Sequence, residues 1–165
     1  MENQGQWEGD FKYKLPLGNG AVFISENKVV YNFGVYDLKP NPSKNKIKED
    51  HPGLIPIGSP YRGHAYSVNF LGASKKARSK SSLRRKIREN YILGKDRSKW
   101  KSDVGLFGKI SFSNIYPGID IQYYFNKDQN LKYDLILKAG ANPDQIQLEY
   151  EGTDRLKLVY GNLLV

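Results

Sequence analysis

The sequence predicts an all-β protein, an antiparallel β-sandwich of about ten strands. Over most of the chain apolar side chains recur at every second position, which is the period of a half-buried strand. Turn-forming residues separate these runs about every 8–12 positions, and the 12 Tyr and 7 Phe residues favour strands further. No run shows the helical crossover pattern of a parallel α/β sheet. We therefore expect a single all-β domain over residues 1–165.

The first half of the chain is typical of a meander followed by a loop. Strands are expected at residues 11–15, 21–25, 28–33 and 62–71. Asn19-Gly20 favours a tight turn between the first two strands, because both residues tolerate positive φ. Residues 39–60 hold five prolines, which cannot donate to a β-ladder, so a long Pro-rich loop is expected there.

The second half of the chain has the stronger strand signal. Strands are expected at residues 106–113, 119–125, 131–138, 146–150, 156–160 and 163–165. Tyr116-Pro117-Gly118 favours a tight turn, with the glycine at positive φ. The apolar residues that end the sequence, Leu163 to Val165, suggest that the domain belongs to a longer protein or lacks a partner strand.

One segment makes the protein basic. The chain has 26 Lys and Arg against 17 Asp and Glu, a net charge of +9. Residues 75–101 hold 12 of the basic residues and two of the acidic ones, a net of +10 that leaves −1 elsewhere. We expect a basic loop over residues 74–89, or a short helix at residues 82–90 with Leu83 and Ile87 on one face.

This basic segment is a candidate site for phosphates or an anionic polysaccharide. The candidate residues are Lys75, Lys76, Arg78, Arg84, Arg85, Lys86 and Arg88. The alternative is a solvated charged loop without a ligand, which such runs usually form. Because the domain body is close to neutral, we expect no specific nucleic-acid partner.

Catalytic signatures are scarce. The chain has no cysteine, which excludes disulfides, thiolate metal sites and a cysteine nucleophile. His51 in the Pro-rich loop and His64 at a strand start are typical of surface or packed residues. Asp120 and Asp134, on neighbouring expected strands, suit the acid pair of a glycosidase, although strand alternation also explains both. We expect a protein that is not an enzyme, with a hydrolase as the alternative.

No metal ion, cofactor or membrane span is expected. Asp128, Asp144 and Asp154 stand singly in separate turns, whereas calcium sites gather several carboxylates in one loop. No apolar run approaches the ~20 residues that a membrane-spanning helix needs.

Aromatic side chains are the last candidate site. Tyr123, Tyr124 and Trp100 are candidates for a platform on which sugars or bases stack. Tyr123-Tyr124 places rings on both faces of one strand, and one of these faces is expected to be core. The other face is either such a platform or part of a second buried layer.

Several blocks of the sequence resemble those of a known family, in order and over almost the whole chain. The blocks are Glu2-Asn3-Gln4-Gly5-Gln6-Trp7 (similar to ENxGQ), Gly63-His64-Ala65-Tyr66, Asn90-Tyr91 with Gly94, Asp96 and Trp100 (similar to NYxxGxDxxxW), Tyr116-Pro117-Gly118-Ile119-Asp120 with Tyr123-Tyr124 (similar to VYPGIDxxYY), and Leu131-Lys132-Tyr133-Asp134. They resemble an N-terminal domain of unknown function found in secreted bacterial proteins with SBBP (β-propeller-like) repeats. The same domain occurs in Bacteroidetes surface proteins associated with gliding and type IX secretion.

The resemblance implies export, a secreted or cell-surface location, and an accessory or adhesion-type role beside other domains of the same polypeptide. It also implies a signal peptide before Glu2 and a domain that continues past Val165. It brings no catalytic residues, and the family uses the stretch around residues 74–89 as a variable linker, so the basicity belongs to this protein. We therefore expect a non-catalytic extracellular structural or adhesion module. The alternative is a carbohydrate-binding module that uses exposed aromatics or the basic segment, with a cell-surface glycan as partner.

Overall fold

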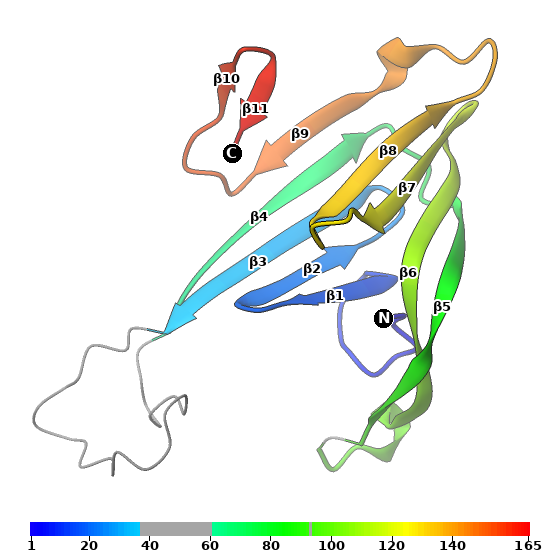
Figure 1. Cartoon of the computed structure of the whole chain (residues 1–165), viewed down its shortest axis with the longest axis vertical. Coiled ribbons are helices and arrows are strands. Elements are labelled where there is room, and N and C mark those ends of the chain that lie inside the picture. Colours follow the sequence, from blue (N-terminus) through cyan, green and yellow to red (C-terminus); the bar gives the residue numbers. More distant parts are fainter. Residues whose placement is uncertain (37–60, 93) are drawn as a thin grey trace, which may run out of the picture.

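Two antiparallel sheets pack face to face in the computed structural model, which describes residues 1–36, 61–92 and 94–165 (Figure 1). The first sheet has the strand order β1-β2-β3-β4-β9 and consists of β1 (Tyr13–Leu17), β2 (Gly20–Ile24), β3 (Lys28–Tyr36), β4 (Tyr61–Leu71) and β9 (Gln147–Glu151). The second has the order β5-β6-β7-β8 and consists of β5 (Arg78–Tyr91), β6 (Lys101–Tyr116), β7 (Ile119–Phe125) and β8 (Leu131–Leu137). This architecture confirms the predicted all-β sandwich.

Four short elements complete the fold of the described residues. A hairpin of β10 (Lys157–Val159) and β11 (Asn162–Leu164) follows β9, and two 3₁₀ turns, η1 (Arg97–Lys99) and η2 (Pro143–Gln145), lie in connections. No helix in the described ranges is long and apolar enough to cross a membrane. The Pro-rich loop expected at residues 39–60, with His51, lies outside the described residues.

The core follows from the period-two pattern. Val22 and Ile24 of β2 and Phe70 of β4 point into the sandwich, where they meet Phe112 of β6 and Ile121 of β7. Most alternate residues of the same strands, such as Phe23, Asn69 and Gln122, are half-buried, as expected where one face of each sheet is solvated. The alternation in β4 therefore predicted its core-facing side chains Val68 and Phe70.

The basic segment corrects the prediction of a loop or short helix. Residues 78–91 form β5, so the loop expected at residues 74–89 is limited to its first few residues. Lys, Arg and Ser are weak strand formers, but β6 offers β5 a long partner with Val104, Phe107 and Ile110, and this pairing satisfies most β5 backbone groups that face β6. Leu83 and Ile87, which suggested a helical face, are both exposed.

β5 and β6 extend beyond the rest of their sheet as a two-stranded ribbon (Figure 1). β7 pairs with β6 from Lys109 to Tyr116, so the preceding half of β6 pairs with β5 alone. The turn η1 closes the far end of this ribbon, and the N-terminal residues pack against one of its sides. The ribbon therefore displays most of the basic segment away from the core.

Candidate functional site

The three residues of the expected aromatic platform lie apart in the structure. Tyr123 is 2% exposed and points into the core. Tyr124 lies on the outer face of the second sheet and donates its hydroxyl to Asp134 Oδ1 at 3.2 Å. Trp100 lies at the end of the ribbon, where its indole N–H donates to the Gly94 carbonyl and the Arg97 guanidinium lies 5.5 Å from its ring. No common surface joins these three rings.

The two candidate acids lie on one face but have separate contacts. Asp120 pairs with Ile136 and Asp134 with Gln122, so the carboxylates are diagonal neighbours on β7 and β8. Asp120 Oδ1 accepts from the Asn114 backbone N–H at 2.8 Å, closing a bulge in β6, and from Lys138 Nζ at 3.1 Å. Asp134 accepts from Tyr124 as described above. These contacts give each carboxylate a structural role in its sheet.

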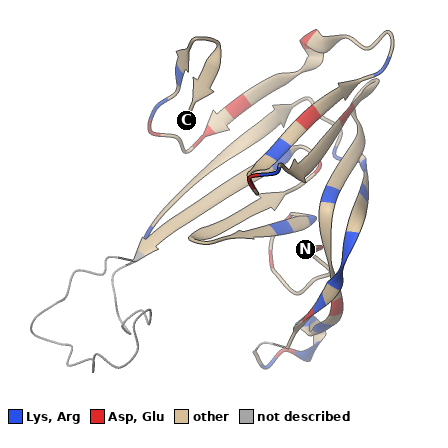
Figure 2. Cartoon of the chain, viewed as in Figure 1, with Lys and Arg blue, Asp and Glu red and all other residues tan. Residues whose placement is uncertain are grey.

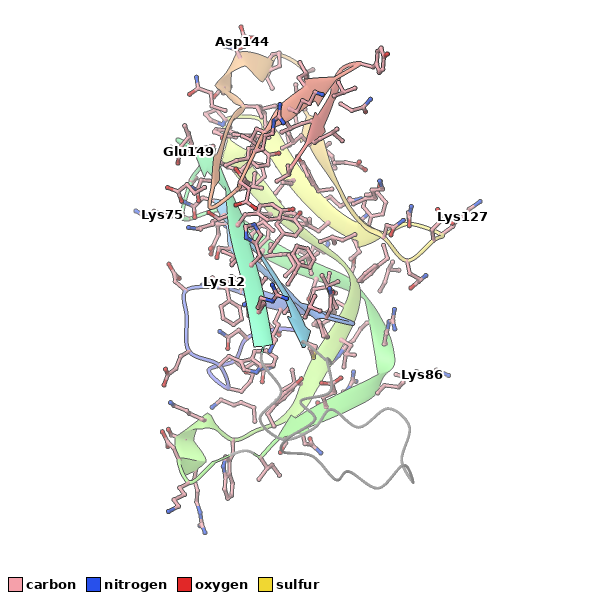
Figure 3. All side chains as sticks on the ribbon, turned by 90° about the vertical axis from the view of Figure 1, so that its left-hand side faces the viewer. Lys12, Lys75, Lys86, Lys127, Asp144 and Glu149 are labelled. Atoms are coloured by element: carbon pink, nitrogen blue, oxygen red, sulfur yellow. The ribbon has the colours of Figure 1, made fainter. Side chains whose placement is uncertain are left out.

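The basic candidates divide into two groups, one at the start of β5 and one around the middle of the strand. Lys75 and Lys76 lie in the turn before the strand and Arg78 begins it, whereas Arg84 to Arg88 lie on the ribbon, roughly 20–30 Å beyond Arg78 at the usual strand rise. Figure 2 shows the Lys and Arg residues spread along β5 and β6, and Figure 3 shows Lys75 and Lys86 on different sides of the molecule. The segment is therefore a line of charge rather than one pocket.

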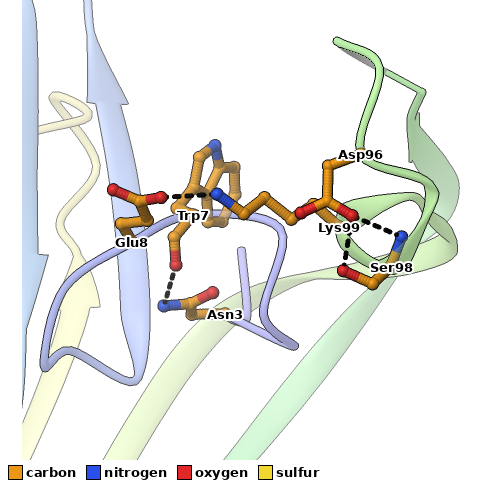
Figure 4. Close-up of polar contacts among 6 residues, drawn as sticks. All are labelled: Asn3, Trp7, Glu8, Asp96, Ser98 and Lys99. Atoms are coloured by element: carbon orange, nitrogen blue, oxygen red, sulfur yellow. Dashed lines mark hydrogen bonds and ion pairs between the residues drawn. The ribbon is translucent and has the colours of Figure 1, made fainter.

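The N-terminal motif block and the block around Tyr91 contact each other (Figure 4). The Asn3 amide donates to the carbonyls of Trp7 and Phe11, and its Oδ1 accepts from the Gly5 N–H at 3.1 Å. The Trp7 ring lies 4.7 Å edge-on from that of Tyr91, and Glu8 forms an ion pair with Lys99. All these groups bind other parts of the chain, which supports the interpretation of the motifs as fold determinants.

Acid is expected to loosen this contact. The hydrogen bond and charge of Lys99 lower the pKa of Glu8, and hydrogen bonds from Ser98 lower that of Asp96. A carboxyl whose pKa is lowered by folding stabilises the folded state at pH values above its unfolded pKa, which is 4.5 for Glu8 and 3.8 for Asp96. This stabilisation is lost as the pH falls through the lowered pKa of the folded state. The chain's two tryptophans, Trp7 and Trp100, both lie here, so their fluorescence is expected to stay constant from about pH 7 to 5 and to shift below about pH 4. A spectrum unchanged at about pH 2.5 would contradict this.

A cleft that the sequence did not indicate lies where the second half of β3 pairs with the first half of β4. It has a volume of about 400 Å³ and is lined by Phe33, His64, Tyr66, Thr153, Asp154, Arg155 and Val165. We call it the aromatic cleft. β3 and β4 run past the end of β8 here, so the second sheet leaves this part of the first sheet uncovered (Figure 1). Because the second sheet does not cover this part, residues on the core-facing side of β3 and β4 are open to solvent here.

The rings of Phe33, His64 and Tyr66 form the floor of the aromatic cleft, and the Tyr31 ring stacks beside them. Tyr31 and Tyr66 are cross-strand partners with ring centroids 4.8 Å apart and an interplanar angle of 11°. Phe33 lies 6.3 Å from each of these rings, and His64 lies 6.5 Å from Tyr66. Such cross-strand pairs stabilise the sheet and also hold the rings rigidly in place.

The tyrosine hydroxyls of this region are close to one another and uncharged at neutral pH. The pKa of Tyr31 is raised, and burial is the largest cause. The nearby hydroxyls of Tyr66, Tyr133 and Tyr150 raise it further, because two neighbouring phenolates would repel each other. Within the described ranges no buried side-chain oxygen or nitrogen lacks a partner, so hydroxyls without a protein partner reach solvent. Of these tyrosines only Tyr66 lines the aromatic cleft, where it places a neutral hydroxyl beside the rings.

Charged groups lie at one wall of the aromatic cleft. Asp154 and Arg155 follow β9 and stand next to each other in the chain, so their charges nearly cancel. The sequence does not indicate this wall, because Asp154 stands as a single acidic residue in a turn. No group of three or more His, Asp or Glu side chains suited to a metal ion occurs in the part of the chain that the structure describes.

Comparison with known proteins gives one match. A family model described as a domain of unknown function, DUF7948, matches residues 1–165. No curated protein and no solved structure matches the chain.

Proposed function

Because the chain belongs to the DUF7948 family, whose description assigns no function, we propose a role from its geometry: a non-catalytic adhesion-type module that binds a carbohydrate in the aromatic cleft. The carrying observation is the cleft itself, in which a half-buried aromatic floor meets a wall with a carboxylate and a guanidinium. Sugars present apolar C–H faces that pack on aromatic rings. Their neighbouring hydroxyl groups also form bidentate hydrogen bonds with carboxylate and guanidinium groups. The aromatic cleft combines both kinds of contact.

Size and charge favour a short uncharged glycan segment. A cleft of about 400 Å³ lies at the lower end of the usual range for ligand sites, which suits roughly one or two sugar rings. Asp154 and Arg155 give this wall almost no net charge, and the basic segment lies on other strands. A neutral sugar therefore fits the aromatic cleft better than a polyanion does.

The cellular setting is part of the same proposal. The motif blocks of residues 2–7, 90–100 and 116–124 are similar to those of N-terminal domains in secreted SBBP-repeat proteins and Bacteroidetes type IX secretion-associated surface proteins. On this basis the domain is secreted or displayed on a cell surface, beside other domains of one long polypeptide. The test is the full-length gene product, which should carry a signal peptide and further extracellular modules.

Glycan binding is tested with the whole chain on an array of neutral and acidic oligosaccharides. We expect several related neutral glycans to bind, and Arg155→Ala to weaken the best of them by about tenfold or more, because a charge-assisted contact contributes roughly 1.5–3 kcal/mol. His64→Ala is expected to weaken the same glycans less, because its ring is at the cleft's exposed edge. Lys127→Ala, in the turn between β7 and β8, is the control that should change nothing.

Two outcomes would contradict the proposal. One is the absence of any neutral glycan hit with a folded domain, which would favour a purely structural role. The other is a set of hits that Arg155→Ala and His64→Ala leave unchanged, which would place the sugar elsewhere. Hydrolysis of a glycan that stops in Asp120→Asn or Asp134→Asn would instead favour the hydrolase alternative.

A further inference from the structure

An irregular stretch of β5 stands out on the ribbon. Arg84 pairs with Phe107 and Arg88 pairs with Gly105, so Arg85, Lys86 and Ile87 lie opposite the single residue Leu106. The Arg88 guanidinium donates to the Arg85 carbonyl at 3.2 Å and closes this bulge on itself. We call the exposed surface formed by residues 83–88 the β5 bulge surface.

The β5 bulge surface carries a net positive charge. Arg84 and Arg88 share one carboxylate, that of Asp103, at 3.7 and 2.7 Å. Arg85 and Lys86 have no carboxylate within ion-pair distance among the described residues. Figure 3 shows Lys86 projecting away from the body of the domain. The four cations of residues 83–88 and the single carboxylate of Asp103 give this surface a net charge of about +3.

Two aliphatic side chains lie among these charges. Leu83 is 70% exposed and Ile87 is 68% exposed. Leu83 also has φ of 56°, a left-handed conformation that leucine rarely adopts and that its neighbours must sustain. Bulges and lysines commonly protect an edge strand from pairing with another chain, and that explains the charges. It does not explain two large aliphatic groups held in water.

We propose that the β5 bulge surface docks onto an anionic lipid surface. In this arrangement the cations contact lipid phosphates, and Leu83 and Ile87 enter the boundary between headgroups and acyl chains. A soluble polyanion needs only the cations and would leave the aliphatic groups in water, so the lipid surface accounts for more of what is observed. This activity uses residues outside the aromatic cleft and is independent of glycan binding.

The test is co-sedimentation of the whole chain with vesicles of phosphatidylcholine containing about a quarter phosphatidylglycerol, and with vesicles of phosphatidylcholine alone. We expect binding to the anionic vesicles only, and weaker binding at high salt because exposed charges are screened. Arg85→Ser with Lys86→Ser is expected to weaken binding roughly 30-fold, at about 1 kcal/mol for each basic residue near the surface. Leu83→Asn with Ile87→Ser is expected to weaken it about tenfold or more, and asparagine tolerates the left-handed backbone at residue 83.

Matched controls separate docking from general stickiness. Leu158→Ser removes an equally exposed leucine (71%) from the C-terminal hairpin, and Lys127→Ser removes an exposed cation from another turn. Neither is expected to change vesicle binding, and circular dichroism checks that every variant is folded. Equal loss in the controls, or no binding to anionic vesicles, would overturn the proposal. Binding to dextran sulfate that Leu83→Asn with Ile87→Ser leaves intact, without vesicle binding, would overturn it in favour of a soluble polyanion.

Discussion

Replacing Phe112 with alanine is expected to lower the free energy of unfolding by about 3–5 kcal/mol. Phe112 has no exposed surface and lies at the centre of the core, with its ring 6.1 Å from that of Tyr13 and 6.4 Å from that of Tyr123. Its partners come from both sheets, so the cavity left by the ring would weaken the contact that joins them. For a domain of this size the loss corresponds to a melting temperature roughly 6–20 °C lower.

Thermal unfolding followed by circular dichroism measures this loss. The matched control is Tyr160→Ala, because Tyr160 is 99% exposed and removing its ring removes almost no packing contacts. The control is expected to change the free energy of unfolding by less than about 0.5 kcal/mol. Similar melting temperatures for Phe112→Ala and the native chain would mean that the sheets do not pack through this residue.

Replacing Gly20 with alanine is expected to cost about 3 kcal/mol or more, at the upper end of overpacking effects. A Cβ atom at this position would lie 1.9 Å from the Asn32 carbonyl oxygen and 3.0 Å from the Cα of Phe33. Both obstacles are backbone atoms of the neighbouring strand, so a side-chain rotation cannot relieve them. β2 and β3 would have to separate at the position where Gly20 pairs with Phe33.

The neighbouring glycine provides the control for this prediction. Gly18 lies two residues earlier, in the turn between β1 and β2, and a Cβ there would meet no atom within 4 Å. Gly18→Ala is expected to be neutral or stabilising by a few tenths of a kcal/mol up to about 1 kcal/mol, because it reduces the freedom of the unfolded chain. Chemical denaturation of both variants gives the comparison, and equal stabilities would refute the close approach of β3 to Gly20.

The core and most strands could be predicted from the sequence because period-two alternation is a local signal. Val68 and Phe70 point into the core together, as their spacing indicated, and the strands around the Pro117-Gly118 turn lie where expected. The basic segment was the exception. Its own residues favour a loop, and only the length of β6 beside it decides that it is a strand.

The candidate site was the least predictable part. Phe33 and His64 occupy core-facing positions by alternation, and no local signal tells that β8 ends before it covers them. Likewise alternation predicted that one of the adjacent rings of Tyr123 and Tyr124 is core, and the structure decides that it is Tyr123 while Tyr124 lies outside. Sequence spacing says which side chains share a face, but not which part of that face the opposite sheet covers.

The sequence by itself determined the all-β class, the inward and outward faces of its strands, and the concentration of charge in residues 75–101, because each depends on neighbouring residues alone. The tertiary structure alone decided the rest. The offset between the sheets leaves the aromatic cleft open, and the pairing of β5 with β6 turns a charged segment into a bulged ribbon. Both depend on strand lengths and registers that are set between distant segments, where the favourable energy comes from packing and ladder hydrogen bonds rather than local preference.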